Sequence, residues 1–349
     1  MKKQIQLALL VFGTFLFTLA LCEIALLFLK PDIYVYRKLL KKGKPYPATF
    51  SPTISFTLPK NKVVNDIYVL NEYGFRGKPI PPPEKSSKKR LVVFGDSYTF
   101  GVLVKEDETY SAQLQKILDN KKAGIDVINA GYHAGYSPDT YYISLKDEIN
   151  YYQPDIIVVG LCMNNDIGDV GANYWKVIDE ASAFPQIVRT NRNYMNHEGT
   201  SIFVEGDEFP YFVLHVPILR QSRFFLGLNN FVDRYIFKNN HLSDLDNRKR
   251  GFKRFETSLR AIDSVAKEHG SKLFFMIIPP YTIRFPDMKG DEDYAINFIK
   301  KELQRPILDL RTVYEQEEDV NQMFIPDDGH FSVYGNKRVA QALSKAIPF

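Results

Sequence analysis

The sequence predicts an α/β fold built on a parallel β-sheet. Short apolar runs of strand length recur along the chain, and amphipathic stretches of helix length separate them. Such alternation is typical of βαβ units, whose helices cover both faces of a parallel sheet. We expect a ligand site where the carboxyl ends of the strands meet. The predicted strands are at residues 90–94, 125–128, 155–159, 272–278 and 306–308.

The composition excludes several other classes of protein. Of the 349 residues, 45% are apolar and 25% are charged, which excludes a disordered chain, a collagen-like chain and a bundle of many membrane spans. The formal charge of +4 is too small and too evenly spread for a nucleic-acid binder, so no nucleic-acid partner is expected. With only Cys22 and Cys162 as cysteines, a disulfide scaffold is also excluded.

An N-terminal transmembrane anchor is predicted over residues 1–30. Residues 7–29 are apolar apart from two threonines and Glu23, and as a helix they extend about 34 Å, which is enough to span a bilayer. The apolar run is longer than that of a signal peptide, which favours an uncleaved anchor. Leu21 precedes Cys22 where lipidation needs a small residue, so a lipid anchor is disfavoured. Glu23 is either a functional carboxylate within the membrane or a side chain that reaches the membrane edge.

The rest of the chain divides at a linker. Residues 31–89 are predicted to be a juxtamembrane region, which ends in a linker rich in proline, lysine and serine. A domain is expected over residues 90–349, with an aromatic-rich insertion at about 168–250. The insertion carries apolar residues at helical spacing (Ile218, Phe225, Leu228, Val232 and Tyr235). They favour a face packed on the domain over a partner or membrane surface, and their position also suits a lid over the site. Helices are predicted at residues 109–118, 141–151 and 252–266, and a last helix carries Val339, Leu343 and Ile347.

A serine follows the first predicted core strand, in the string Gly-Asp-Ser-Tyr-Thr-Phe-Gly. This string is weak evidence by itself, because it equally suits a turn or a helix cap. Near the other end of the chain, however, His330 follows Asp327 and Asp328. A serine hydroxyl becomes a nucleophile when a base takes its proton, and that base needs a carboxylate to orient it. Ser97, His330 and one of the two aspartates supply these three groups.

Two further loops could donate hydrogen bonds to an oxyanion. One follows the second strand and carries Gly131 and Gly135, and the other follows the third strand and carries Asn164 and Asn165. A glycine allows close approach of a backbone N–H, and an asparagine amide is a side-chain donor. Together with the N–H of Ser97, these groups could stabilise the negative charge that develops during acyl transfer.

Serine, glycine, asparagine and histidine, in this order on successive loops, resemble the SGNH superfamily of hydrolases, also called the GDSL family. The resemblance covers about residues 90–346 without the insertion, and the four blocks together are far more specific than any one. It implies a flavodoxin-like three-layer α/β/α sandwich with a parallel sheet. It also implies that Ser97 is the nucleophile and His330 the base, with no metal and no organic cofactor.

The resemblance also selects residues within the ambiguous loops. Gly135 and Asn165 are implied as the oxyanion donors, with Gly131 as the fallback for the glycine. The usual spacing of three residues before the histidine favours Asp327 over Asp328 as the third member of the triad. One departure from the pattern is Tyr98, which replaces the leucine of the GDSL name.

The sequence therefore predicts a membrane-anchored serine esterase or acyl hydrolase that acts on carboxylic esters, above all O-acetyl groups of an envelope carbohydrate. Alternatives are an O-acyltransferase to polysaccharide, a lipase, and a catalytically silent, membrane-tethered assembly protein of the same fold. Polar and aromatic side chains in the predicted site loops favour a sugar over a long acyl chain. These side chains are Tyr98, Thr99, Asn129, Tyr132, His133, Tyr136, Asn164 and Asn165.

The charges around the anchor conflict with the location that the resemblance implies. Lys2 and Lys3 precede the anchor and more basic residues follow it, which by count favours a cytoplasmic body. Large domains cross a membrane largely regardless of this count. Because anchored members of the superfamily commonly act on envelope glycans, we expect a single-pass protein whose catalytic domain lies outside the cytoplasmic membrane.

Overall fold

A computed structural model gives the chain two compact units. The anchor unit comprises residues 1–46 and 192–241, and the sheet unit comprises residues 47–191 and 242–349. The residues that the structure describes are 2–29, 49–51, 53–54, 56–58, 60–64, 67–80, 87–132, 136–189, 222–225, 228, 244–280, 291–326 and 328–348.

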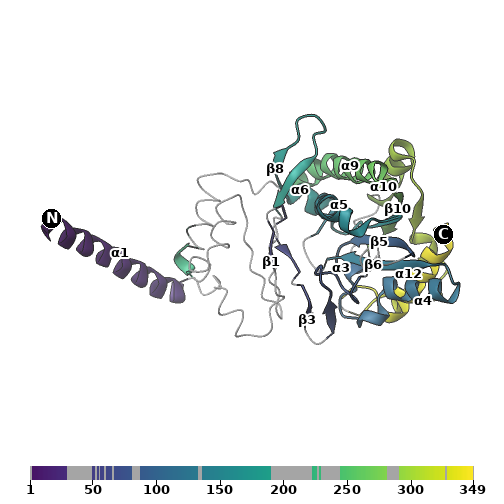
Figure 1. The fold of residues 1–349 in the computed structure, drawn as a ribbon, viewed down its shortest axis with the longest axis horizontal. Helices are drawn as coiled ribbons and strands as arrows, with labels where there is room; N and C mark the ends of the chain where they lie inside the picture. Colours follow the sequence, from purple (N-terminus) through teal and green to yellow (C-terminus); the bar gives the residue numbers. More distant parts are fainter. Residues whose placement is uncertain are drawn as a thin grey trace. The chain divides into compact units, whose positions relative to one another are not determined.

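The anchor unit contains the long apolar helix α1 (Lys2–Leu29) (Figure 1). Among the described residues this is the one helix that is long and apolar enough to cross a membrane. The Glu23 carboxylate of α1 accepts hydrogen bonds from the backbone N–H groups of Arg223, at 2.9 Å, and Phe224, at 3.0 Å. It also accepts one from the Ser222 hydroxyl. Glu23 is therefore a hydrogen-bonded carboxylate within its own unit.

Parallel strands form the central sheet of the sheet unit, in the order β6-β5-β7-β10-β11. Numbered along the chain, this is the 2-1-3-4-5 order of flavodoxin-like folds. The predicted parallel α/β fold is confirmed, and β5, β6 and β7 each continue past the apolar run that predicted them. The strands are β5 (Lys89–Gly95), β6 (Ile125–Gly131), β7 (Ile156–Cys162), β10 (Lys272–Ile278) and β11 (Ile307–Asp309).

Helices cover both faces of this sheet (Figure 1). On one face lie α5 (Pro138–Tyr152) and α9 (Asp244–Glu268), and on the other lie α4 (Tyr110–Asn120) and α12 (Val333–Ala346). α5 begins before the predicted residue 141, because Ser137 caps it and proline suits the first helical position. The shorter helices are α3 (Ser97–Phe100), α6 (Asp166–Ala172), α10 (Asp291–Phe298), α11 (Arg311–Tyr314) and the single turns η2 (Glu106–Glu108), η5 (Ile299–Leu303) and η6 (Val320–Met323).

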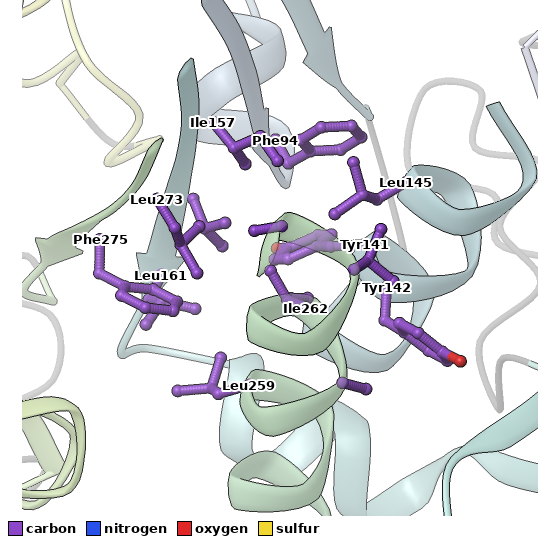
Figure 2. Close-up of a cluster of buried hydrophobic side chains, with 14 of the residues drawn as sticks. Phe94, Tyr141, Tyr142, Leu145, Ile157, Leu161, Leu259, Ile262, Leu273 and Phe275 are labelled. Carbon is purple, nitrogen blue, oxygen red and sulfur yellow. The ribbon is translucent and has the colours of Figure 1, made fainter. Parts of the chain in front are cut away.

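The core consists of two apolar clusters, one on each face of the sheet. Side chains alternate along a strand, so Val92 and Phe94 of β5 belong to one cluster and Leu91 and Val93 to the other. Figure 2 shows the first cluster, in which side chains of α5 and α9 pack against those of the strands. Because the strands are buried on both faces, they appear in the sequence as continuous apolar runs rather than alternating ones.

The segment between the anchor and the sheet contributes two small antiparallel pairs. β1 (Thr49–Phe50) pairs with β2 (Phe56–Thr57), and β3 (Lys62–Val64) pairs with β4 (Tyr68–Leu70). The backbone N–H of Val188 donates to the carbonyl of Thr53 at 2.9 Å, and Arg76 forms a β-bridge with Asn129 of β6. The described residues between 49 and 80, which the composition places in a juxtamembrane region, therefore pack as part of the sheet unit.

The insertion begins as a β-hairpin. β8 (Tyr174–Ile178) pairs antiparallel with β9 (Pro185–Arg189), and α9 then begins at Asp244, earlier than the predicted residue 252. Of the apolar residues that indicated a face or a lid, Ile218, Val232 and Tyr235 lie outside the described residues. Phe225 and Leu228 belong to the anchor unit. The alternative between a packed face and a lid stays a prediction.

Candidate active site

Ser97 is the first residue of a single helical turn at the carboxyl end of β5. Asp96 caps this turn, since its carboxylate accepts a hydrogen bond from the N–H of Tyr98 at 2.9 Å. Gly101 ends the turn at φ 80°, a left-handed conformation that favours glycine. In the Gly-Asp-Ser-Tyr-Thr-Phe-Gly string, Asp96 therefore caps the helical turn, residues 97–100 form it and Gly101 ends it. This string follows β5, and the topological switch point of the sheet lies between β5 and β7.

His330 reaches Ser97 from the loop before α12. The Nε2 atom of His330 lies 2.8 Å from the Oγ atom of Ser97, and its Nδ1 atom lies 2.5 Å from Oδ1 of Asp328. With the Nδ1 proton donated to the carboxylate, Nε2 is free to accept the serine proton. The His330 and Asp328 side chains are 23% and 34% exposed, so the pair is accessible to a substrate and only partly screened by water. Two residues that are 233 positions apart in the sequence are thereby brought together.

The carboxylate in contact with His330 belongs to Asp328. Its Oδ1 atom also accepts the backbone N–H of His330 at 3.1 Å, so one oxygen fixes both the loop and the imidazole. Asp327, which the family spacing favoured, lies outside the described residues. The loop is closed by a hydrogen bond of 2.8 Å from the N–H of Ile325 to the carbonyl of His330.

Asn165 is the N-cap residue of α6, three residues after the end of β7, the strand that pairs with β5. Its Nδ2 atom donates to Oδ2 of Asp169 at 2.9 Å, which fixes the amide and leaves its second N–H for another acceptor. Gly135 lies outside the described residues. Gly131 is the last residue of β6, and a Cβ atom there would lie 2.4 Å from the backbone nitrogen of Phe100. Close packing of β6 against α3 thus explains why a glycine occupies position 131.

The strand order, the Ser97 turn at the switch point and the contact between Ser97 and His330 decide the fold type. The chain has a flavodoxin-like parallel α/β fold, which is the fold that the SGNH/GDSL resemblance implies.

Solved structures similar to this one include three hydrolases. A lipolytic protein of the G-D-S-L family from Desulfitobacterium hafniense DCB-2 is 14% identical, with a TM-score of 0.43 over 74% of this chain and 100% of that chain. A lipase/acylhydrolase from Enterococcus faecalis is 14% identical, with a TM-score of 0.42 over 74% and 94%. The acetylxylan esterase Axe2 from Geobacillus stearothermophilus, in a catalytic mutant, is 15% identical, with a TM-score of 0.41 over 76% and 96%.

No family model matches the chain, and no curated protein matches it. Structural similarity at these identities and scores does not establish a shared reaction. The chemistry of this chain must therefore be argued from its own site.

Tyr98, which departs from the GDSL pattern, joins the serine turn to the histidine loop. Its hydroxyl donates to the carbonyl of Gly329 at 2.7 Å, and its ring centroid lies 4.9 Å from that of His330. The ring also meets Phe331 edge-on at 5.0 Å. Burial raises the pKa of Tyr98 well above its usual value, so the hydroxyl stays protonated and remains a donor. A leucine could fill this space but could not make the hydrogen bond.

Two buried carboxylates, those of Asp96 and Asp166, were not predicted from the sequence as part of the candidate site. Burial raises the pKa of Asp96 to about 6, although the N–H of Tyr98 and the nearby His330 act in the opposite direction. Burial, and then the negative charge of Asp96, also raise the pKa of Asp166 well above its usual value. Asp166 accepts hydrogen bonds from the N–H of Cys162 at 2.8 Å and from the hydroxyl of Tyr141 at 3.1 Å. One signal for these carboxylates was available in the sequence, because Asp96 directly precedes Ser97 and Asp166 directly follows Asn165.

Cys162 lies beside these buried aspartates, since its N–H donates to Asp166. Burial raises the pKa of the Cys162 thiol well above its usual value, which agrees with an unreactive core residue. Within the described ranges, no group of three or more histidine, cysteine, aspartate or glutamate residues could hold a metal ion. His133, which was considered as a lining residue, lies outside the described residues.

Proposed function

We propose that the protein is a membrane-anchored serine esterase that forms an acyl-enzyme on Ser97. The observation that carries this proposal is the chain of hydrogen bonds from Ser97 Oγ through His330 to Asp328, at 2.8 and 2.5 Å. Nucleophile, base and orienting carboxylate are the three groups that acyl transfer by serine requires.

The first half of the reaction makes the acyl-enzyme. Ser97 Oγ attacks the ester carbonyl carbon while its proton passes to Nε2 of His330, and a tetrahedral intermediate with a negatively charged oxygen forms. Asp328 stabilises the resulting imidazolium. When the intermediate collapses, the bond to the alkoxy oxygen breaks, and this oxygen leaves as an alcohol with the proton from Nε2. Ser97 then carries the acyl group as an ester.

The oxyanion is the charge that the protein must stabilise. We assign this role to the N–H of Ser97, the free amide N–H of Asn165 and the N–H of Gly135. The hydrogen bond from Asn165 to Asp169 supports the assignment, because a donor that is already oriented pays no reorganisation cost during the reaction.

The second half of the reaction releases the acyl group. His330 takes a proton from water, whose oxygen attacks the acyl carbon, and the resulting acid leaves as Ser97 Oγ recovers its proton from Nε2. A sugar hydroxyl in place of water gives the alternative, an O-acyltransferase to polysaccharide. The same acyl-enzyme serves both reactions, so the acceptor decides between them.

The proposed substrate is a short acyl ester on a carbohydrate, with acetyl as the acyl group. Partly exposed Asn164 supports this proposal, since an amide suits sugar hydroxyls, and so does partly exposed Tyr132, whose ring stacks on that of Tyr136 at 3.8 Å. Other side chains once considered for this role are engaged within the protein. Tyr98 binds the Gly329 carbonyl, and Asn129 donates to the carbonyl of Thr99 at 2.9 Å.

The test is the rate of hydrolysis of aryl esters of graded chain length by the full chain in detergent. We expect acetyl and propionyl esters to be hydrolysed fastest. In a second assay, the protein should release acetate from isolated envelope glycan. A tenfold advantage for chains of eight or more carbons, or ~1.4 kcal/mol in transition-state binding, would instead favour the lipase alternative.

We further propose that α1 anchors the protein in the cytoplasmic membrane with the sheet unit outside. The length and composition of α1 support the anchor, and a carbohydrate substrate of the envelope would require the outside location. An alkaline phosphatase fused after the last residue should be active in cells. An inactive phosphatase fusion, with an active cytoplasmic reporter at the same place, would reverse the orientation.

A further inference from the structure

A buried arginine from the segment that precedes the linker contacts the turn that carries Ser97. The turn before this arginine is organised by Asn71, whose Oδ1 accepts the backbone N–H groups of Tyr73 at 3.0 Å and Phe75 at 3.1 Å. Arg76 then bridges Leu70 of β4 on one side and Asn129 of β6 on the other. The sequence Asn-Glu-Tyr-Gly-Phe-Arg therefore places Arg76 at the edge of the central sheet.

The guanidinium of Arg76 is aimed at the backbone directly after α3. Its Nη1 atom donates to the carbonyl of Phe100 at 2.8 Å and also to that of Gly101, and its Nη2 atom donates to the carbonyl of Val104. The guanidinium plane lies over the rings of Tyr68 and Phe100, at 4.7 and 5.1 Å. A planar group with several N–H donors can hold several carbonyls at once, which a lysine cannot do in the same way.

These carbonyls belong to a stretch that is hydrogen-bonded to Ser97 itself. The N–H groups of Gly101 and Val102 donate to the Ser97 carbonyl at 3.0 and 3.2 Å. The neighbouring Asn129 holds the same turn through the carbonyl of Thr99. Displacement of the stretch after α3 would therefore be transmitted to Ser97, whose Oγ must stay within hydrogen-bonding distance of His330.

We propose that Arg76 is a positioning residue for Ser97, which holds the turn of the nucleophile in register with His330. This inference rests on the proposed function, because it assumes that Ser97 is the nucleophile. It makes the segment between the anchor and the linker a necessary part of the catalytic domain, not only a connection.

Arg90 of β5 provides a matched control for Arg76. Arg76 and Arg90 are both 3% exposed, and Arg90 also donates to backbone carbonyls, those of Tyr151 and Tyr152 at 3.2 and 3.0 Å. Arg90 lies near the start of β5, whereas Ser97 follows its end. Loss of either guanidinium should destabilise the fold, but only loss of Arg76 should change the position of Ser97 and slow its labelling.

The experiment compares Arg76→Gln, Arg76→Lys and Arg90→Gln in the full chain in detergent, well below the Tm of each variant. The first readout is the second-order rate at which a fluorophosphonate labels Ser97. The second readout is hydrogen exchange of the backbone amides at residues 97–104, measured by mass spectrometry. We expect Arg76→Gln to label at least tenfold more slowly than Arg90→Gln, with faster exchange in this segment. Arg76→Lys should fall between Arg76→Gln and the unmodified protein.

Equal labelling rates for Arg76→Gln and Arg90→Gln would overturn the positioning role, and so would equal exchange at residues 97–104. If Arg76→Gln does not fold, the same comparison with Arg76→Lys decides. Absence of labelling in the unmodified protein would contradict the proposed function, and with it the role of Arg76 in positioning a nucleophile. Exchange would then still show whether Arg76 holds the turn, so the two failures are distinguishable.

Discussion

Ser97→Ala and His330→Ala are each expected to lower kcat for aryl-ester hydrolysis by on the order of 10⁴-fold or more. The reason is that the serine and the histidine act as one unit, joined by the 2.8 Å contact between Oγ and Nε2. Loss of either removes the activated nucleophile, so the double variant should be no slower than the slower single variant. The measurement is the initial rate on an aryl acetate at saturating concentration.

A serine elsewhere in the sheet unit separates this effect from damage to the fold. Ser258 is buried in α9, and its hydroxyl donates to the carbonyl of Arg254 at 2.8 Å. Ser258→Ala should therefore change stability modestly and leave kcat per folded molecule unchanged. Full activity in Ser97→Ala would show that another group is the nucleophile.

Asp328→Asn is expected to lower kcat by about 10² to 10⁴-fold. An asparagine cannot stabilise the imidazolium, and its amide can hold His330 with the proton on the wrong nitrogen. Asp327→Asn should have little effect, because the described contact to Nδ1 comes from Asp328. Both variants remove one negative charge from adjacent positions, so the difference between them isolates orientation of the imidazole from the overall charge of the loop.

Asp96→Asn is a second control, because this carboxylate also acts electrostatically on His330. The Asp96 side chain caps the Ser97 turn by accepting the N–H of Tyr98, and an asparagine oxygen can do the same. Its effect on kcat should be smaller than that of Asp328→Asn.

A larger effect of Asp327→Asn than of Asp328→Asn would show that the family spacing selects the carboxylate correctly.

Local sequence patterns predicted the sheet and selected Ser97 and His330, which we propose as nucleophile and base. The runs that became β5, β6, β7 and β10 are apolar because both of their faces are buried, so a local pattern was sufficient. Ser97 and His330 could be paired because the ends of parallel strands converge at one edge of a sheet. That argument needs only the order of the elements along the chain.

What the sequence could not show depends on long-range contacts. Asp327 and Asp328 both lie within three residues of His330 in the sequence, so a local pattern leaves the choice between them open. Composition places Arg76 in a juxtamembrane region. Its β-bridge to Asn129 joins positions far apart in the sequence, so no local pattern could predict this contact. The role of Tyr98 was hidden for the same reason, since its acceptor is the carbonyl of Gly329.

Covalent labelling of the full chain by a fluorophosphonate tests the central claim most directly. The Ser97 oxygen would attack phosphorus and displace fluoride, while His330 accepts the serine proton. We predict one phosphonate per chain, located on Ser97 by peptide mass spectrometry, with no adduct in Ser97→Ala. Absence of an adduct in the unmodified protein, at a probe concentration that labels a known serine esterase completely, would contradict the account and favour a catalytically silent assembly protein of the same fold.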